Sequence, residues 1–144
     1  MKIKPLVPNF IKPEYKKDFS AGIDIYLQED VELTVGVNNI IPLGFASEIP
    51  QGYVGLLVPR SGTGVKGVGL RNTVGVIDSD YRGEWIAHIT VDEQGNNSFG
   101  DVMQFKRGER LLQCLIIPYY KAYIEITDTL SDTDRGTGGF GSTN

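Results

Sequence analysis

Five short segments of the chain combine glycine with residues that could do chemistry, namely arginine, aspartate, serine and glutamine. They are residues 21–24, 59–62, 72–83, 107–113 and 135–143. Arginine and clustered backbone amides bind phosphate groups, and carboxylates either hold Mg²⁺ through water or take a proton from a water molecule. These residue types therefore indicate chemistry on a phosphorylated ligand.

Two aspartates are candidates for metal binding and acid–base chemistry. Asp24 stands inside the apolar run 23–27, where it is either a solvated strand residue or an acid near a Mg²⁺ ion. Asp78 follows Val76 and Ile77, which places its carboxylate at the mouth of the core. The alternative for Asp78 is an ordinary Asp-Ser-Asp turn between two strands.

Three other segments carry groups suited to binding phosphate. Arg60 and Ser61 lie before a glycine-rich loop, which suits phosphate binding or a simple turn, but their spacing is not that of a P-loop. Gln113 lies in an apolar run, where its amide either bonds within a sheet or faces a ligand. Arg135 and Phe140 belong either to a disordered tail or to an arm that folds over a nucleotide.

Alternating apolar and polar residues predict the strands that would position these segments. The alternating patterns lie at residues 23–27, 31–35, 53–58, 85–91 and 122–127. The apolar run 111–117 is typical of a strand buried on both faces. No window keeps a helical period, so we expect one all-β domain, a sandwich, jelly roll or barrel. The glycine-rich residues 130–144 predict a flexible C-terminal arm.

Composition excludes several classes of function. The 144 residues carry a formal charge of −4, with one cysteine and one histidine, so nonspecific binding to nucleic acid and a closed zinc site within one subunit are not expected. No apolar run approaches the ~20 residues that cross a bilayer, and no signal-peptide core follows the N-terminus. We therefore expect a cytoplasmic protein that does not contact membranes, with Cys114 as an unreactive core thiol.

In chain order, the five segments resemble the signature motifs of the homotrimeric deoxyuridine triphosphatases (dUTPases). The motifs read AGIDI from residue 21, PRSG from residue 59, GVIDSDYRG from residue 75, GERLLQ from residue 108 and RGTGGFGST from residue 135. The resemblance implies a jelly-roll dUTPase domain over residues 1–129 and an arm over residues 130–144 that closes an active site. It also implies a homotrimer with shared active sites that hydrolyses dUTP to dUMP and pyrophosphate with Mg²⁺, in dUMP biosynthesis.

The resemblance further implies a role for individual residues. Asp78 is expected to be the general base that orients the water attacking the α-phosphorus, and Asp24 is expected to contact Mg²⁺ through water. The residues that it implies for substrate binding are Arg60, Ser61, Gly62 and Gln113 on the phosphates, Asn72, Gly75 and Tyr81 on the uracil and deoxyribose, and Arg135, Phe140, Gly141, Ser142 and Thr143 from the arm.

Two other functions stay open at this point. One is a dCTP deaminase, or a deaminase–dUTPase, on the same scaffold; that family usually carries Arg-Ser-Ser where this chain has Arg60, Ser61 and Gly62. The other is a non-catalytic trimeric protein with a binding or regulatory role, against which Asp24 and Asp78 argue, because a binding protein needs no base. A regulatory protein partner at the long turn 92–99 is a further alternative.

Overall fold

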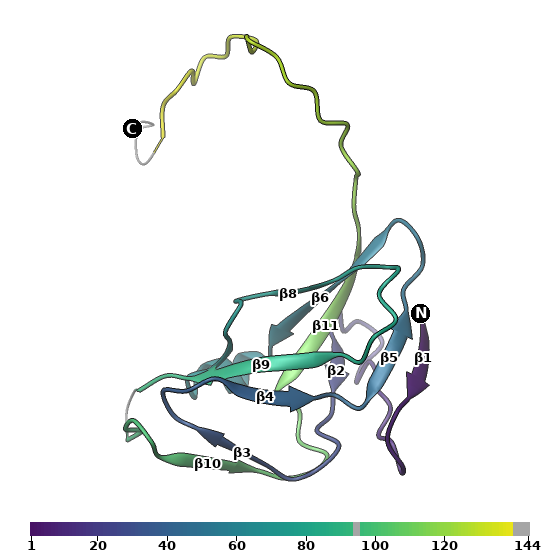
Figure 1. Cartoon of the computed structure of the whole chain (residues 1–144), viewed down its shortest axis with the longest axis vertical. Helices are drawn as coiled ribbons and strands as arrows, with labels where there is room; N and C mark the ends of the chain where they lie inside the picture. The colour runs from purple at the N-terminus through teal and green to yellow at the C-terminus, as the bar shows by residue number, and fades with distance from the viewer. Residues whose placement is uncertain (94–95, 140–144) are drawn as a thin grey trace.

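The computed structural model describes residues 1–93 and 96–139, and the chain folds almost entirely into β-strands (Figure 1). The strands are β1 (Lys2–Pro5), β2 (Ile23–Ile25), β3 (Val31–Thr34), β4 (Asn39–Pro42), β5 (Phe45–Glu48), β6 (Tyr53–Pro59), β7 (Val68–Leu70), β8 (Gly75–Ile77), β9 (Ile86–Val91), β10 (Val102–Phe105) and β11 (Leu112–Pro118). The helix α1 (Ser61–Gly64) is a single turn. The predicted all-β class is confirmed. Within the described ranges, no helix has the length and apolarity needed to span a membrane.

A four-stranded antiparallel sheet positions most of the candidate residues. Its strand order is β2-β11-β6-β8. The register pairs Asp24 of β2 with Gln113 of β11, and Gln113 in turn with Val58 of β6. On the other side of β6, Ile77 of β8 pairs with Gly55. Four of the five candidate segments therefore lie on this sheet or on the loops that leave it.

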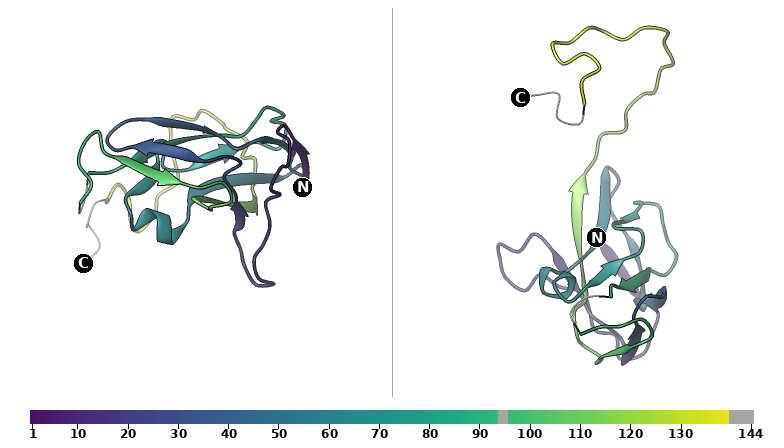
Figure 2. Two further views of the ribbon diagram at one scale, coloured as in Figure 1. Left: turned by 90° about the horizontal axis from the view of Figure 1, so that it is seen from below. Right: turned by 90° about the vertical axis from the view of Figure 1, so that its left-hand side faces the viewer.

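Three smaller antiparallel sheets complete the body, with strand orders β4-β9-β7, β10-β3 and β1-β5 (Figures 1 and 2). All the sheets contribute side chains to one hydrophobic core. Ala87, Ile89 and Val91 of β9 and Trp85 just before it are buried, as the alternation predicted. The Trp85 ring packs on Phe45 with 4.9 Å between ring centroids. This packing of sheets around one core agrees with the predicted jelly-roll-like fold.

One strand prediction is wrong for the single chain, and another holds only in part, because β11 forms as predicted but is not buried on both faces. In β11, Leu112 and Cys114 are buried, but Ile117 is exposed, because the second face of this strand is not fully covered. Residues 122–127 show the alternation of a strand but form none, since no strand of the described chain lies beside them. Both departures lie where the chain leaves the body.

The C-terminal segment runs away from the body after β11 ends at Pro118 (Figures 1 and 2). Its large apolar side chains are exposed; they are Tyr120, Tyr123, Ile124, Ile126 and Leu130. So many exposed apolar groups on an extended segment are typical of a surface that binds another protein chain. The predicted arm residues Phe140, Gly141, Ser142 and Thr143 lie outside the described residues.

Candidate active site

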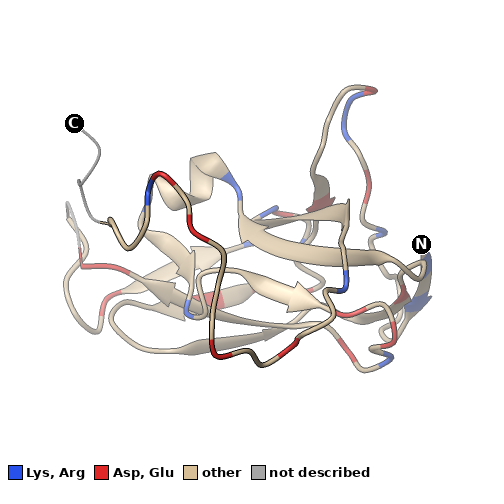
Figure 3. Cartoon of the chain, turned by 90° about the horizontal axis from the view of Figure 1, so that it is seen from above, with Lys and Arg blue, Asp and Glu red and all other residues tan. Residues whose placement is uncertain are grey.

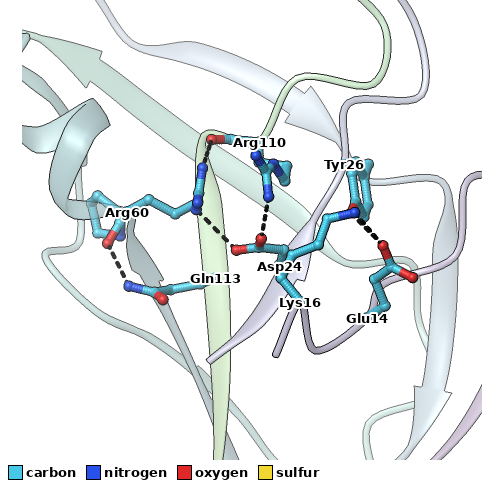
Figure 4. A network of polar contacts seen from close by, with 8 residues as sticks. Glu14, Lys16, Asp24, Tyr26, Arg60, Arg110 and Gln113 are labelled. Atoms are coloured by element: carbon cyan, nitrogen blue, oxygen red, sulfur yellow. Dashed lines mark hydrogen bonds and ion pairs between the residues drawn. The ribbon is translucent and has the colours of Figure 1, made fainter. Parts of the chain in front are cut away.

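The carboxylate of Asp24 joins two arginine side chains that are far apart in the sequence (Figure 4). Its Oδ1 lies 2.9 Å from Nε of Arg60, which follows β6, and its Oδ2 accepts a hydrogen bond of 2.8 Å from Nη1 of Arg110, which precedes β11. The Asp24 side chain is 8% exposed, whereas those of Arg60 and Arg110 are 34% and 33% exposed. Of the two alternatives for Asp24, a solvated strand residue is therefore wrong.

Gln113 lies beside this ion-pair cluster on the neighbouring strand. Its Nε2 donates to the carbonyl oxygen of Pro59 over 3.4 Å, a long and weak hydrogen bond. A Cβ atom at Gly22 would stand 3.1 Å from Cδ of Gln113 and closer still to its Oε1. The glycine therefore leaves room for the carboxamide, whose N–H groups are only weakly engaged by the protein.

The loop before β2 holds Asp24 from its other side. Glu14 and Asp24 exchange backbone hydrogen bonds of 2.9 and 3.3 Å. The Glu14 carboxylate accepts hydrogen bonds from Nζ of Lys16 at 2.6 Å and from Oη of Tyr26 at 2.8 Å. The hydrogen bond with Lys16, and after it the one with Tyr26, lowers the pKa of Glu14. The hydrogen bond with Glu14 is in turn the largest cause of the raised pKa of Lys16. At Asp24, β2 is thus flanked by Glu14 on one edge and by β11 on the other, which fixes the direction of the Asp24 carboxylate.

Arg60 and Arg110 also line a cavity of about 390 Å³, together with Gly62 and Lys66. Among the described residues that line this cavity, Glu109 is the only acidic one, so three positive groups face one negative group. Elsewhere on the described chain, acidic and basic residues are interspersed (Figure 3). A cavity with this excess of positive charge attracts anionic ligands. Ser61 is exposed at the start of α1, beside this cavity.

Asp78 lies in a different place, directly after β8, and its side chain is exposed. It lines an open cavity of about 920 Å³ together with Asp80, Arg82 and Lys121. The Arg82 side chain closes the loop, since its Nη1 donates to the carbonyl oxygen of Ser79 over 2.7 Å. The hydrogen bond from Arg82 therefore holds the Asp-Ser-Asp segment as a loop at the rim of the cavity. In the single chain, the Asp78 side chain is open to solvent.

The residues expected at the nucleoside also lie near β8. Asn72 belongs to the turn that joins β7 and β8, and the next residue, Thr73, has a positive φ of 66°. That conformation is strained for a β-branched residue. Gly75 is buried where β8 begins. Tyr81 follows Asp78 in the chain, and its Oη donates to a backbone carbonyl at 2.9 Å, which fixes the orientation of the ring.

The two groups of candidates do not meet on one chain. Through the sheet register, Asp24 is level with Val58 of β6, and Asp78 is level with Val54. The two backbone positions are separated by four residues along β6 and by three strand spacings across the sheet, which together amount to roughly 20 Å. Arg135 belongs to neither group. It lies in the exposed C-terminal segment, where its Nε donates to the carbonyl oxygen of Gly138 at 3.0 Å.

The sequence reasoning missed Arg110, the second arginine bonded to Asp24. A signal was present, because Arg110 stands directly before an apolar strand in the segment that also carries Gln113. A charged residue at the entrance to a buried strand needs a partner. That the partner is Asp24 became clear only from the pairing of β2 with β11.

The donor set around Asp24 fits a Mg²⁺ ion that is contacted through water. Among residues 1–93 and 96–139, no group of three or more His, Cys, Asp or Glu side chains could hold a metal ion directly. Oδ2 of Asp24 accepts one N–H of Arg110 and Oδ1 forms an ion pair with Arg60, so the carboxylate keeps lone pairs that a metal-bound water could use. Mg²⁺ usually retains several waters and takes its other oxygen ligands from substrate phosphates.

Comparison with known proteins gives a family match over most of the chain. The dUTPase family model matches residues 9–144. A deoxyuridine 5'-triphosphate nucleotidohydrolase from Nautilia profundicola is 41% identical over 144 residues, covering 99% of this chain and 97% of that protein. Both comparisons extend through the central sheet and the C-terminal segment.

Solved structures agree with the sequence comparison. A mutant dUTPase of Staphylococcus bacteriophage 80alpha, solved with dUpNHpp, superimposes with a TM-score of 0.85 at 28% identity, covering 98% of this chain and 96% of that chain. A mutant dUTPase from phage phi11 of S. aureus, whose structure describes a structural Mg(II) ion, superimposes with a TM-score of 0.75 at 27% identity, covering 89% and 96%.

Proposed function

This chain belongs to the dUTPase family, and on that premise we propose how its residues hydrolyse dUTP to dUMP and pyrophosphate. The observation that carries the proposal is the separation of Asp78 from the positively charged cavity beside Asp24. Hydrolysis of a triphosphate needs a group that activates water and groups that hold the phosphates. The chain has both sets of groups, but on different parts of its surface.

The complete site forms between copies of the chain in a homotrimer. One copy supplies the cavity with Arg60, and a second copy supplies Asp78. The exposed apolar side chains of the C-terminal segment support this arrangement, because burying them on another copy removes them from water. A closed ring of three like subunits repeats the same heterologous contact, so it forms the same shared site three times.

The phosphate chain of dUTP binds at the first copy's cavity. Arg60 neutralises phosphate charge, and Ser61, Gly62 and Gln113 donate hydrogen bonds to phosphate oxygens. The weak hydrogen bond of the Gln113 amide supports this role, because little is lost when the amide turns toward a ligand. Mg²⁺ bound to the triphosphate, with Asp24 accepting from one of its waters, would neutralise charge on the leaving pyrophosphate.

Asp78 acts as the general base. Its carboxylate accepts a proton from the water that attacks the α-phosphorus, which breaks the bond from that phosphorus to the bridging oxygen and releases pyrophosphate. The exposed position of Asp78 at the rim of a cavity supports this role, because the carboxylate is open to a substrate held by another copy. A positioned base of this kind contributes roughly 10²–10⁴ in rate.

The segment around β8 selects the nucleoside. Asn72 and the backbone from Gly75 bind the polar edge of uracil, and the Tyr81 ring packs on the deoxyribose where a 2′-hydroxyl would collide. The strained φ of Thr73 supports this role, since strain of this kind concentrates at ligand-binding turns. Cytosine is rejected because its reversed donors and acceptors would leave buried groups without partners.

The C-terminal arm of a copy closes the site. Arg135 binds the γ-phosphate, Phe140 stacks on the uracil, and Gly141, Ser142 and Thr143 complete the phosphate contacts. Closure of the arm excludes water from the reacting phosphate and so strengthens the interactions that stabilise charge. The exposed, extended course of residues 119–139 supports an arm that can reach a neighbouring copy.

The decisive experiment is pyrophosphate release from dUTP, dTTP, dCTP and UTP, each with and without Mg²⁺. We expect release from dUTP alone, and only with Mg²⁺. Detectable ammonia from dCTP would replace the hydrolase by a deaminase or a deaminase–dUTPase. Tight nucleotide binding without pyrophosphate release would replace it by a non-catalytic binding protein.

A further inference from the structure

The loop that carries Asp78 begins where the central sheet ends. β8 ends at Ile77, which pairs with Gly55 of β6, and Asp78 follows directly beyond this pair. The Asp78 side chain is exposed at the rim of the cavity of about 920 Å³. A general base must lie within hydrogen-bond distance of the water that it activates. Because Asp78 lies outside the sheet ladder, the loop needs other contacts to hold it in place.

Arg82 supplies such contacts from within the same loop. Its Nη1 donates to the carbonyl oxygens of Ser79 at 2.7 Å and of Tyr81 at 3.1 Å. The Tyr81 N–H in turn donates to the carbonyl oxygen of Asp78 at 3.2 Å, which closes a turn. One guanidinium group therefore bonds both to the residue that follows Asp78 and to the residue that closes the turn.

Arg82 also connects this loop to the core of the body. A longer hydrogen bond of 3.4 Å runs from its Nη1 to the carbonyl oxygen of Ser47 in β5. Ser47 is buried, and its Oγ accepts a hydrogen bond of 3.1 Å from Nε1 of Trp85, which is buried in the core. Because β5 and Trp85 are held by core packing, Ser47 gives the loop a fixed point of attachment.

We propose that Arg82 is a positioning residue for the general base. By holding the backbone of residues 79–81, it keeps the Asp78 carboxylate where it can reach the water at a substrate bound by a neighbouring copy. This inference rests on the proposed function, because it assumes that Asp78 is the base. Arg82 acts through Asp78 rather than on the substrate. A misplacement of about 1 Å in a reacting group costs roughly 10²-fold in rate, so holding the loop has a measurable effect on turnover.

Substrate binding depends less on Arg82 than turnover does. The Tyr81 ring is oriented by the hydrogen bond from its Oη to the carbonyl oxygen of Glu84. The Glu84 carboxylate in turn accepts the Gly44 N–H at 3.0 Å. The positively charged cavity with Arg60 lies on another part of the chain. Loss of the Arg82 contacts should therefore reduce kcat and leave affinity nearly intact.

The first test is Arg82→Met, which keeps an unbranched side chain but removes every N–H donor. We expect kcat for dUTP to fall about 10- to 100-fold, because the base is no longer held in position. The Kd of dUpNHpp, measured by calorimetry, should stay within about threefold of the wild-type value. An unchanged kcat, or a Kd that rises as much as kcat falls, would overturn the proposal.

Arg107→Met is the matched control. The Arg107 guanidinium also bonds to backbone carbonyl oxygens, those of Gln28 and Asn9, but it does so away from the Asp78 loop. Its loss should therefore leave both kcat and Kd unchanged. A fall in kcat as large as that of Arg82→Met would show a general effect of losing such an arginine, which would also overturn the proposal.

Arg82→Gln separates the role of the donor from the role of the charge. Glutamine restores an N–H donor without restoring the positive charge. Because positioning requires a donor to the loop carbonyl groups, we expect Arg82→Gln to recover part of the kcat that Arg82→Met loses. No recovery would assign the effect to charge and overturn the positioning role. Should Arg82→Met fail to fold, Arg82→Gln is compared directly with the wild type, with a lower kcat and an unchanged Kd expected.

The second test asks whether Arg82 acts through Asp78. In an Asp78→Asn chain the base is already lost, so adding Arg82→Met should lower the residual kcat by less than about twofold. A further loss as large as in the wild-type chain would overturn the positioning role. Circular dichroism and light scattering check that each variant keeps its fold and assembly. Pyrophosphate release by the wild type tests the proposed function separately, so a failure here leaves that result standing.

Discussion

Asp24 in β2 and Asp78 directly after β8 lie at opposite edges of the central sheet β2-β11-β6-β8, toward opposite ends of β6. Asp24 is buried and bonded to two arginines, whereas Asp78 is exposed. One chain therefore presents a positively charged cavity and an exposed carboxylate that lie too far apart to serve the same phosphate group. The predictions for Asp78 and for mixed assemblies depend on this division.

Replacing Asp78 by asparagine should remove turnover and leave binding intact. The amide keeps the shape of the side chain but cannot accept the proton of the attacking water, so kcat should fall about 10²- to 10⁴-fold. The Kd of dUpNHpp, measured by calorimetry, should stay within about threefold of the wild-type value. Asp80→Asn is the control, because Asp80 lines the same cavity two residues away. Equal losses in both variants would point to a general effect of charge.

Mixed assemblies should reveal the shared site. Asp78→Asn subunits lack the base, and a chain truncated after Asp134 lacks the arm, so each should be nearly inactive alone. When the two are unfolded together and refolded, random assembly should restore roughly one quarter of the sites. A site works only if its base comes from a truncated subunit and its arm comes from an Asp78→Asn subunit, and each of these two events has a chance of about one half. The measurement is pyrophosphate release with the trimer verified by light scattering. A mixture as inactive as its components would mean that base and arm come from the same copy.

Gly22→Ala should weaken phosphate binding through Gln113. The new methyl group would collide with the Gln113 carboxamide and displace it from its present position. Losing one hydrogen bond of this kind should raise the KM for dUTP about two- to tenfold with little change in kcat. Gly64→Ala is a suitable control, because nothing lies within 4 Å of a Cβ atom at that position. An unchanged KM in Gly22→Ala would remove Gln113 from the phosphate contacts.

The Cys114 thiol should resist alkylation in the native protein. Burial raises the pKa of Cys114 to about 12, from an ordinary value of 9.0. The stability linked to the thiol is complete below pH 9 and is lost between pH 9 and 12, because only the unfolded chain releases the proton there. Iodoacetamide at pH 8 should label the chain in urea but not the native protein. Urea unfolding at a fixed protein concentration should also lose less stability between pH 8 and 10 in Cys114→Ala than in the wild type.

The sequence alone determined that the fold is all-β, and it identified most of the candidate residues. Alternation with period two is a local property, so it located β9 and its buried face from Trp85 to Val91 without any tertiary information. The glycine-rich motifs with arginine and aspartate likewise indicated phosphate chemistry, because the types of side chain limit the ligands they can bind.

Only the tertiary structure decided which of these residues act together. Strand order and register are set by contacts between residues distant in the sequence, and these placed Arg110 and Arg60 on Asp24 and left Asp78 on the far side of β6. The same long-range contacts explain the two departures from the strand predictions. The alternation in residues 122–127 and the apolar face of β11 describe surfaces suited to burial, but burial requires a partner surface that a single chain does not provide.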